Sequence, residues 1–192
     1  MSLFILHFLI QGVGAFDFWW EMSLVLVLLF GTGVLLDRSF RGFLQEDILR
    51  HPVRKVLLGI LSAGGLYGLF FMGHQVAGNI FSRAADDIQA VYAFREGASA
   101  LRIGLLMVFI IGPGEELVWR SMLQRHMEDR LSPLSGYLLA AFLYAAVHAV
   151  TGNTMLVTSA ALCGLYWGAL FLRFRSPLLV AVSHTAWDIL IF

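Results

Sequence analysis

The sequence from Leu134 to Val150 reads LSGYLLAAFLYAAVHAV and contains no Asp, Glu, Lys or Arg. A run of this length and apolarity is typical of a helix that crosses a membrane. Of the 192 residues, 59% are hydrophobic and only 14% are charged. A soluble domain carries about a quarter charged residues. We therefore predict an all-α, polytopic membrane helical bundle that forms a single domain over residues 1–192.

Six apolar runs in the chain could cross a membrane, and the arginines indicate how they are oriented. If all six cross, the loops after the first, third and fifth runs lie on one side and hold most of the Lys and Arg residues. The positive-inside rule then places these loops in the cytoplasm and both termini outside. A seventh, shorter apolar stretch from Leu3 to Phe16 is predicted to be an interfacial or half-inserted helix. The six predicted spans are Trp19–Leu36, Val56–Ile80, Ala98–Met127 (interrupted by Gly112-Pro113-Gly114), Leu134–Val150, Met155–Leu172 and Pro177–Phe192.

The third of these runs contains the sequence EELVWR, from Glu115 to Arg120. Acidic side chains are costly at membrane depth, so a pair of glutamates there indicates a functional site. Residues four apart share a helix face, and Glu116 can therefore pair with Arg120. Glu115 points about 100° away from Glu116, which leaves its carboxylate for proton chemistry. A structural Glu–Arg pair between helices is the alternative, but it does not account for the second glutamate.

Two later runs each carry a histidine with a partner one helical turn away. His148 follows Tyr144 by four residues, so the aromatic ring can cover the imidazole. His184 precedes Asp188 by four residues, and the carboxylate can fix the tautomer of His184. Hydrogen bonding between helices is the alternative role for each histidine taken alone.

These motifs are predicted to lie at a similar depth in the membrane. At about 1.5 Å per helical residue, His148 lies about 21 Å from the start of its run and His184 about 10 Å from the start of its own. Glu116 lies about 16 Å from the end of its run. With helix tilt, all three fall in the middle of a hydrocarbon core about 30 Å thick. We therefore expect one buried site between residues 115 and 188, built from Glu115, Glu116, Arg120, His148, His184 and Asp188.

The order of these motifs resembles that of a known family. Glu-Glu-x-x-x-Arg, aromatic-x-x-x-His and His-x-x-x-Asn/Asp on successive membrane helices are similar to the type II CAAX prenyl endopeptidase and bacteriocin-processing (CPBP) intramembrane glutamic proteases, which include Abi-like proteins. The resemblance covers Glu115 to Asp188. It implies that Glu115 activates a water with the help of His148, and that Glu116 and Arg120 hold the site together. It also implies that His184 and the residue at position 188 stabilise the tetrahedral oxyanion.

Two positions depart from the commoner pattern of that family. Tyr144 stands where phenylalanine is usual, and Asp188 stands where asparagine is frequent. An ionised carboxylate would repel an oxyanion, so Asp188 is either protonated or orients His184 instead.

Alternatives to a glutamate mechanism differ in how much support they find in the sequence. The chain lacks the His-Glu-x-x-His of zinc proteases, the Gly-x-Gly-Asp of aspartyl intramembrane proteases and the Gly-x-Ser-x-Gly nucleophile elbow. A zinc site remains open, because Glu115, His148 and His184 form a His₂Glu ligand set. The resemblance favours a mechanism without metal or other cofactor.

We therefore expect a multi-pass intramembrane endopeptidase, in a bacterial inner membrane, whose partners are the lipid bilayer and a membrane-associated protein or peptide precursor. A bacteriocin-like leader or a C-terminal sorting tail is favoured over a prenylated protein. The zero net charge argues against a nucleic-acid partner. A non-catalytic immunity or scaffold protein of the same fold is one alternative. A small proton-coupled transporter is another, although the inverted repeats that would favour it are not evident.

Two smaller features predict packing. The pairs Gly64/Gly68 and Gly164/Gly168 have the spacing that lets membrane helices approach closely. Cys163 is the single cysteine, so we expect a small buried side chain and no intrachain disulfide.

Overall fold

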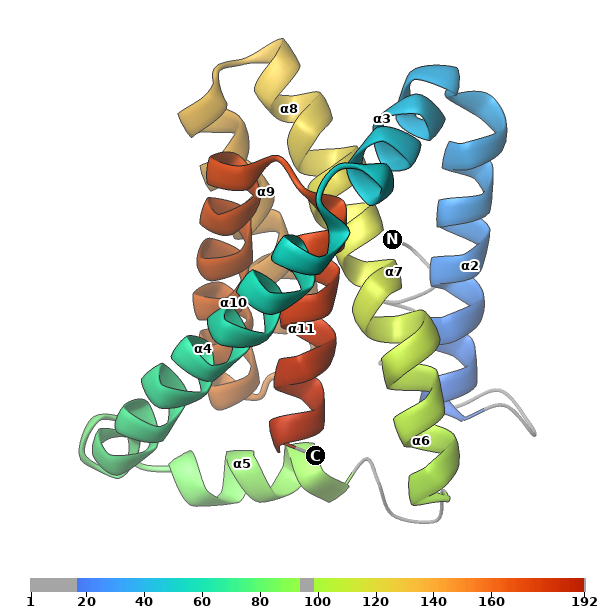
Figure 1. Cartoon of the computed structure of the whole chain (residues 1–192). Helices are drawn as coiled ribbons and strands as arrows, with labels where there is room; N and C mark the ends of the chain where they lie inside the picture. Colours follow the sequence, from blue (N-terminus) through green and yellow to red (C-terminus); the bar gives the residue numbers. More distant parts are fainter. Residues whose placement is uncertain (1–16, 94–98, 192) are drawn as a thin grey trace.

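A computed structural model describes residues 17–93 and 99–191, and every regular element in these two ranges is helical (Figure 1). The predicted all-α class is confirmed. The stretch from Leu3 to Phe16, predicted to be an interfacial helix, lies outside the described residues. In chain order the elements are α2 (Phe18–Leu36), α3 (Arg38–Leu49), α4 (Pro52–Ile80), α5 (Ala84–Ala93), α6 (Ala100–Leu106), η1 (Met107–Ile111), α7 (Gly112–Glu116), η2 (Leu117–Gln124), α8 (Arg125–Arg130), α9 (Pro133–His148), η3 (Ala149–Thr151), α10 (Thr154–Phe174) and α11 (Pro177–Ile191).

Among the described residues, four helices are long and apolar enough to cross a membrane: α2, α4, α9 with its η3 extension, and α10. The predicted count of six spans is therefore approximate. The other two predicted spans correspond to the shorter apolar helix α11 and to the helical run from α6 to α8. This run extends along the height of the bundle in Figure 1. The 29 residues of α4 span about 43 Å, more than the hydrocarbon thickness, and α4 crosses the bundle obliquely.

The run from α6 to α8 does not break at the sequence Gly112-Pro113-Gly114. The backbone N–H of Gly112 bonds to the carbonyl of Met107, five residues earlier, so the turn before Pro113 has π-helical geometry. A proline ring collides with the carbonyl four residues before it in a regular α-helix, and a wider turn relieves that collision. A second π-helical segment, η2, follows Glu116 directly. The two glutamates therefore lie on a short α-helical piece between two widened segments.

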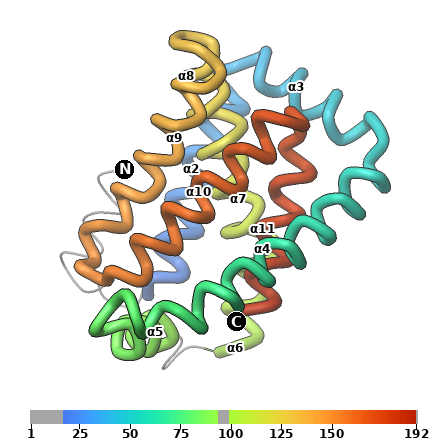
Figure 2. The backbone as a smooth tube through the Cα atoms, turned by 90° about the vertical axis from the view of Figure 1, so that its left-hand side faces the viewer, coloured from blue at the N-terminus to red at the C-terminus, as the bar shows by residue number. Residues whose placement is uncertain are grey.

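Helix α11 lies inside the bundle, packed against α4 on one side and α7 on the other (Figures 1 and 2). Helices α9 and α10 form an adjacent pair, while α2 packs against η1, α7 and η2. One core cluster joins α4, α9, α10 and α11. Its members are Ala63, Leu66, Tyr144, Ala160, Cys163, Trp167 and Trp187.

The two glycine pairs behave differently. A Cβ atom at Gly168 would lie 2.8 Å from the ring of Tyr137, and one at Gly164 would lie 3.1 Å from a carbonyl oxygen of α9. The predicted close approach is therefore confirmed for α10 against α9. It is wrong for Gly64 and Gly68, because a Cβ atom at either would meet no described atom within 4 Å. Cys163 is buried and free, as expected.

Two buried aspartates fix the starts of α10 and α11. Asp47 on α3 accepts the backbone N–H of Leu178 at 2.8 Å, near the start of α11, and an ion pair from Lys55 at 2.5 Å. Asp87 on α5 accepts the backbone N–H of Thr154 at 3.0 Å, at the start of α10. Carboxylates satisfy the unpaired N–H groups of a first helical turn and favour its dipole. They therefore help to set the positions of α10 and α11 in the bundle.

Candidate active site

The short helix α7 brings both glutamates into the interior. A Cβ atom at Gly112 would lie 2.7 Å from Oγ1 of Thr185 on α11, and one at Gly114 would lie 3.2 Å from Leu26 on α2. Only glycine permits so close an approach on both sides. As a result Glu115 is 5% exposed and Glu116 is fully buried.

Glu116 is the centre of a buried ion-pair network. Its Oε1 accepts a hydrogen bond from Nη1 of Arg120 at 3.0 Å and another from Nδ1 of His184 at 2.8 Å. The expected pairing one turn along the helix is therefore present. Arg120 also donates to the carbonyl of Cys163 at 3.4 Å, and its guanidinium lies 4.5 Å from the ring centre of Tyr144. These contacts join α7 and η2 to α9, α10 and α11.

His184 is held on several sides. Its ring stacks on Trp167 with centroids 3.8 Å apart, and the indole N–H of Trp167 donates to Ser183 at 3.1 Å. The Nε2 atom of His184 lies 3.5 Å from Oδ1 of Asp188 and 3.9 Å from Oε2 of Glu115. His184 and Asp188 therefore share a helix face, as the sequence predicts, and His184 lies close to both glutamates.

Glu115 has a different set of neighbours. The hydroxyl of Tyr144 donates to its Oε2 at 2.7 Å. From the sequence, Tyr144 is expected only to cover His148 with its ring, and that ring contact is present with centroids 5.0 Å apart. The hydrogen bond from Tyr144 to Glu115 is not predicted. The replacement of the usual phenylalanine by tyrosine was the available signal, because the two differ only by this hydroxyl.

His148 is the last residue of α9 and is half-buried. Its Nδ1 lies 2.7 Å from the backbone carbonyl of Tyr144. A carbonyl oxygen can only accept, so Nδ1 carries the proton, and Nε2 is the basic nitrogen of the neutral ring.

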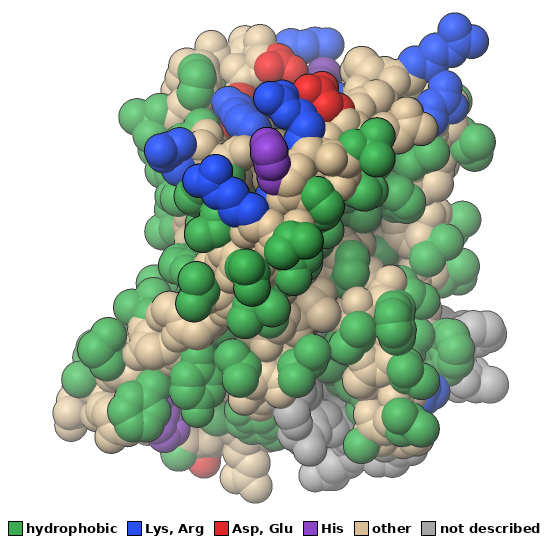
Figure 3. Space-filling view, viewed as in Figure 1, with side chains coloured by type: hydrophobic (Ala, Val, Ile, Leu, Met, Phe, Trp, Pro, Cys, Tyr) green, Lys and Arg blue, Asp and Glu red, His purple; other side chains and the backbone are tan. Residues whose placement is uncertain are grey.

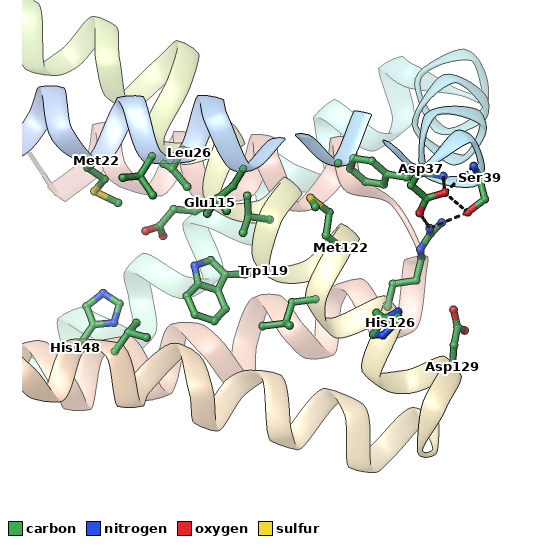
Figure 4. Close-up of a pocket in the computed structure, with 18 residues that line it drawn as sticks. Met22, Leu26, Asp37, Ser39, Glu115, Trp119, Met122, His126, Asp129 and His148 are labelled. Atoms are coloured by element: carbon green, nitrogen blue, oxygen red, sulfur yellow. Dashed lines mark hydrogen bonds and ion pairs between the residues drawn. The ribbon is translucent and has the colours of Figure 1, made fainter. Parts of the chain in front are cut away.

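Glu115 and His148 line one end of a cavity of about 540 Å³ (Figure 4). Of the six polar side chains expected in the site, these two line the cavity, and the other four are not among its lining residues. The cavity is bounded by α2, the start of α3, the run from α7 to α8, and α9. Its middle is apolar, with Met22, Leu26, Val118, Trp119, Met122 and Leu123, and its far end is polar, with Asp37, Ser39, Arg125, His126 and Asp129.

The C-terminal half of the chain is similar to a known protein family. Residues 97–190 match a family model described as type II CAAX prenyl endopeptidase Rce1-like. In these residues the chain is similar to the Rce1-like family. The resemblance stated from the three motifs is confirmed, and the matched segment contains all six polar site residues and Tyr144. No curated protein and no solved structure matches the chain.

The polar end of the cavity in this Rce1-like protein is held by an ion pair. Oδ2 of Asp37 lies 3.7 Å from Nη2 of Arg125. The Ser39 hydroxyl and the backbone N–H groups of Ser39 and Phe40 donate to Asp37. These hydrogen bonds, the Ser39 hydroxyl first, hold the pKa of Asp37 below its ordinary value, because they favour the charged carboxylate. Asp37 is therefore ionised at neutral pH and pairs with Arg125.

The three candidate zinc ligands can be compared with the geometry of a metal site. Nδ1 of His148 lies against a backbone carbonyl and Nδ1 of His184 against Glu116, so each histidine could face an ion only through Nε2. Nε2 of His184 lies 3.9 Å from Oε2 of Glu115, somewhat more than the roughly 3.4 Å that separates two tetrahedral ligands of one zinc ion. Among the described residues, no three His, Cys, Asp or Glu side chains are grouped so as to hold a metal ion.

Proposed function

We propose that this Rce1-like protein is an intramembrane endopeptidase that hydrolyses a peptide bond through a water activated by Glu115. The observation that carries the proposal is the position of Glu115 and His148. They belong to a buried polar cluster, yet both line the same cavity, where a substrate and a water can reach them. The similarity of the chain to a protease family supports the same reaction.

The geometry supports a division of tasks between the two cavity residues. Tyr144 occupies Oε2 of Glu115, so Oε1 is the carboxylate oxygen that remains for water. As the water oxygen attacks the peptide carbonyl carbon, Glu115 accepts its proton and later passes it to the amine that leaves. Nε2 of His148 accepts a hydrogen bond from the same water and orients it.

The residues behind the cavity hold this arrangement in place. Glu116 and Arg120 fix α7 and η2 against the rest of the bundle through the contacts described above. His184 directs Nε2 toward Glu115, at 3.9 Å, and in this proposal it donates to an oxyanion formed beside Glu115. Asp188 orients the ring of His184 and does not contact the oxyanion, because two negative charges would repel each other.

The cavity also suggests where the substrate comes from. Its middle is apolar and its far end is polar, which suits a membrane-associated protein or peptide whose cleaved segment runs from the membrane surface inward. By the positive-inside rule the arginine-rich end faces the cytoplasm. Our proposal is therefore a multi-pass protein of a bacterial inner membrane whose substrate is a peptide precursor.

A cleavage assay in cells tests the proposal. Membrane-tethered reporter proteins that carry different apolar peptide segments are co-expressed with wild type, Glu115→Gln or Glu46→Gln. Glu46 is a matched control because it is an exposed glutamate outside the cavity. We expect wild type and Glu46→Gln to release the reporter, and Glu115→Gln to release none, since an amide cannot accept the proton of water. Cleavage by a well-expressed Glu115→Gln variant would rule out the mechanism. A reporter bound by wild type but never cut would instead favour the scaffold alternative.

A further inference from the structure

One end of the molecule is strongly basic. We define the basic end as residues 37–55, 125–130 and 173–175, which comprise α3 with the start of α4, α8, and the turn between α10 and α11. These segments hold nine Lys or Arg and five Asp or Glu, a net charge of +4. Figure 3 shows Lys and Arg side chains gathered at this end above a flank of hydrophobic side chains.

Some of these basic side chains form ion pairs within the molecule. Lys55 pairs with Asp47, Arg125 with Asp37, and Arg175 with Glu128. These pairs join α3 to α4, α3 to α8, and α8 to the turn after α10. They show that the three segments form one continuous surface.

Other arginines of the basic end form no such ion pair with the described residues. Arg38, Arg54 and Arg173 are exposed and form no ion pair with any described residue. Each has a large exposed apolar side chain within two residues of it in the sequence. Leu36 is 85% exposed, Val53 is 71% exposed and Phe174 is 42% exposed.

We propose that the basic end binds the phosphate groups of acidic phospholipids in the leaflet that it faces. A guanidinium group forms paired, charge-assisted hydrogen bonds with phosphate oxygens. The neighbouring apolar side chains would enter the acyl region below the headgroups, an arrangement typical of membrane-surface anchors. A soluble acidic partner would match the charge but would leave these apolar side chains in water.

The basic end adjoins the cavity. Asp37 and Arg125 belong to the basic end and also line the polar end of the cavity. Arg38 directly follows Asp37 in the chain. Acidic lipids bound at the basic end therefore lie beside the polar end of the cavity.

Lipid association can be measured without knowing the substrate. The full-length protein is reconstituted in phosphatidylcholine vesicles with spin-labelled phosphatidylglycerol or spin-labelled phosphatidylcholine, and the motionally restricted fraction of each label is recorded. We compare wild type with a triple variant, Arg38→Gln, Arg54→Gln and Arg173→Gln. Arg83→Gln is the matched control, because Arg83 is an exposed arginine at the opposite end. Melting curves in detergent verify that the variants fold.

Each arginine near a charged surface contributes about fivefold to association at low salt. We expect wild type and Arg83→Gln to prefer phosphatidylglycerol over phosphatidylcholine, and the folded triple variant to lose most of that preference. The wild-type preference should also weaken as salt is added. Equal restriction of the two labels in wild type would overturn the proposal, and so would an equal loss of preference in the triple variant and Arg83→Gln. Neither outcome depends on proteolytic activity.

Discussion

Glu115 and Glu116 are neighbours in sequence with the same side chain, yet their surroundings differ in almost every respect. Glu116 is fully buried and bonded to Arg120 and His184, so its negative charge is matched by a cation within the protein. Glu115 accepts one hydrogen bond from the neutral hydroxyl of Tyr144 and lines the cavity. A rotation of about 100° around the helix therefore places one carboxylate in a buried ion pair and the other at the cavity.

In the mechanism that we propose, this difference gives the two glutamates different tasks. Glu116 is bonded to Arg120 at 3.0 Å and does not line the cavity, so it joins helices and does not reach a substrate. Glu115 lines the cavity and has no arginine partner, so it can reach a water there. We therefore expect substitutions on the Glu116 side to change stability, and substitutions on the Glu115 side to change activity alone.

The largest effect is expected for Arg120→Ala. This change leaves Glu116 buried without its counter-charge, which costs about 3–5 kcal/mol. The chain contains a matched control, because Arg50 pairs with Glu46 at the same helical spacing and 3.1 Å, but with side chains 71% and 66% exposed. Arg50→Ala should change stability by less than about 1 kcal/mol.

Thermal unfolding in detergent and accumulation in the membrane measure both variants. Arg120→Ala should lose stability and activity together, while Glu115→Gln should keep its melting temperature. An Arg120→Ala protein of normal stability but without activity would contradict a structural role for Arg120. It would indicate that Arg120 contacts the substrate.

A smaller effect is expected for Tyr144→Phe, which removes the hydrogen bond to Glu115 and leaves the ring in place. A hydrogen bond to a charged group contributes about 1.5–3 kcal/mol, so we expect kcat/KM to fall by about ten- to a hundredfold. Folding should be preserved, because the ring contacts with Arg120 and His148 remain. Tyr137→Phe is the control on the same helix, since its hydroxyl bonds to a backbone carbonyl outside the cavity. If both variants retain full activity, the hydroxyl of Tyr144 does not position Glu115.

The sequence predicts those parts of the site that follow from helix geometry. Spacings of four residues correctly pair Glu116 with Arg120 and bring His184 beside Asp188. Contacts between helices depend on which face each helix presents, and a helix that is apolar all round does not reveal this. Helix α2 is of this kind, so the position of Met22 in the cavity does not follow from the pattern. Helix α9 is another, so the bond from Tyr144 to Glu115 does not follow either. For the same reason the spacing of Gly64 and Gly68 predicts a contact that the described residues do not form.

The smallest expected effect is that of chelation, which we predict to leave activity unchanged. Purified protein should also contain less than one zinc ion per chain. A zinc site would have to draw Glu115, His148 and His184 within about 2.0–2.2 Å of one ion. Nδ1 of His184 can stay bonded to Glu116 while Nε2 turns toward the ion, and Glu115 would then be a ligand instead of the proton acceptor. Stoichiometric zinc, with activity lost on chelation and restored by zinc, would show that Glu115 has this other role. Mutation of any of the three residues is expected to abolish activity under either mechanism, so the metal assay is the measurement that distinguishes them.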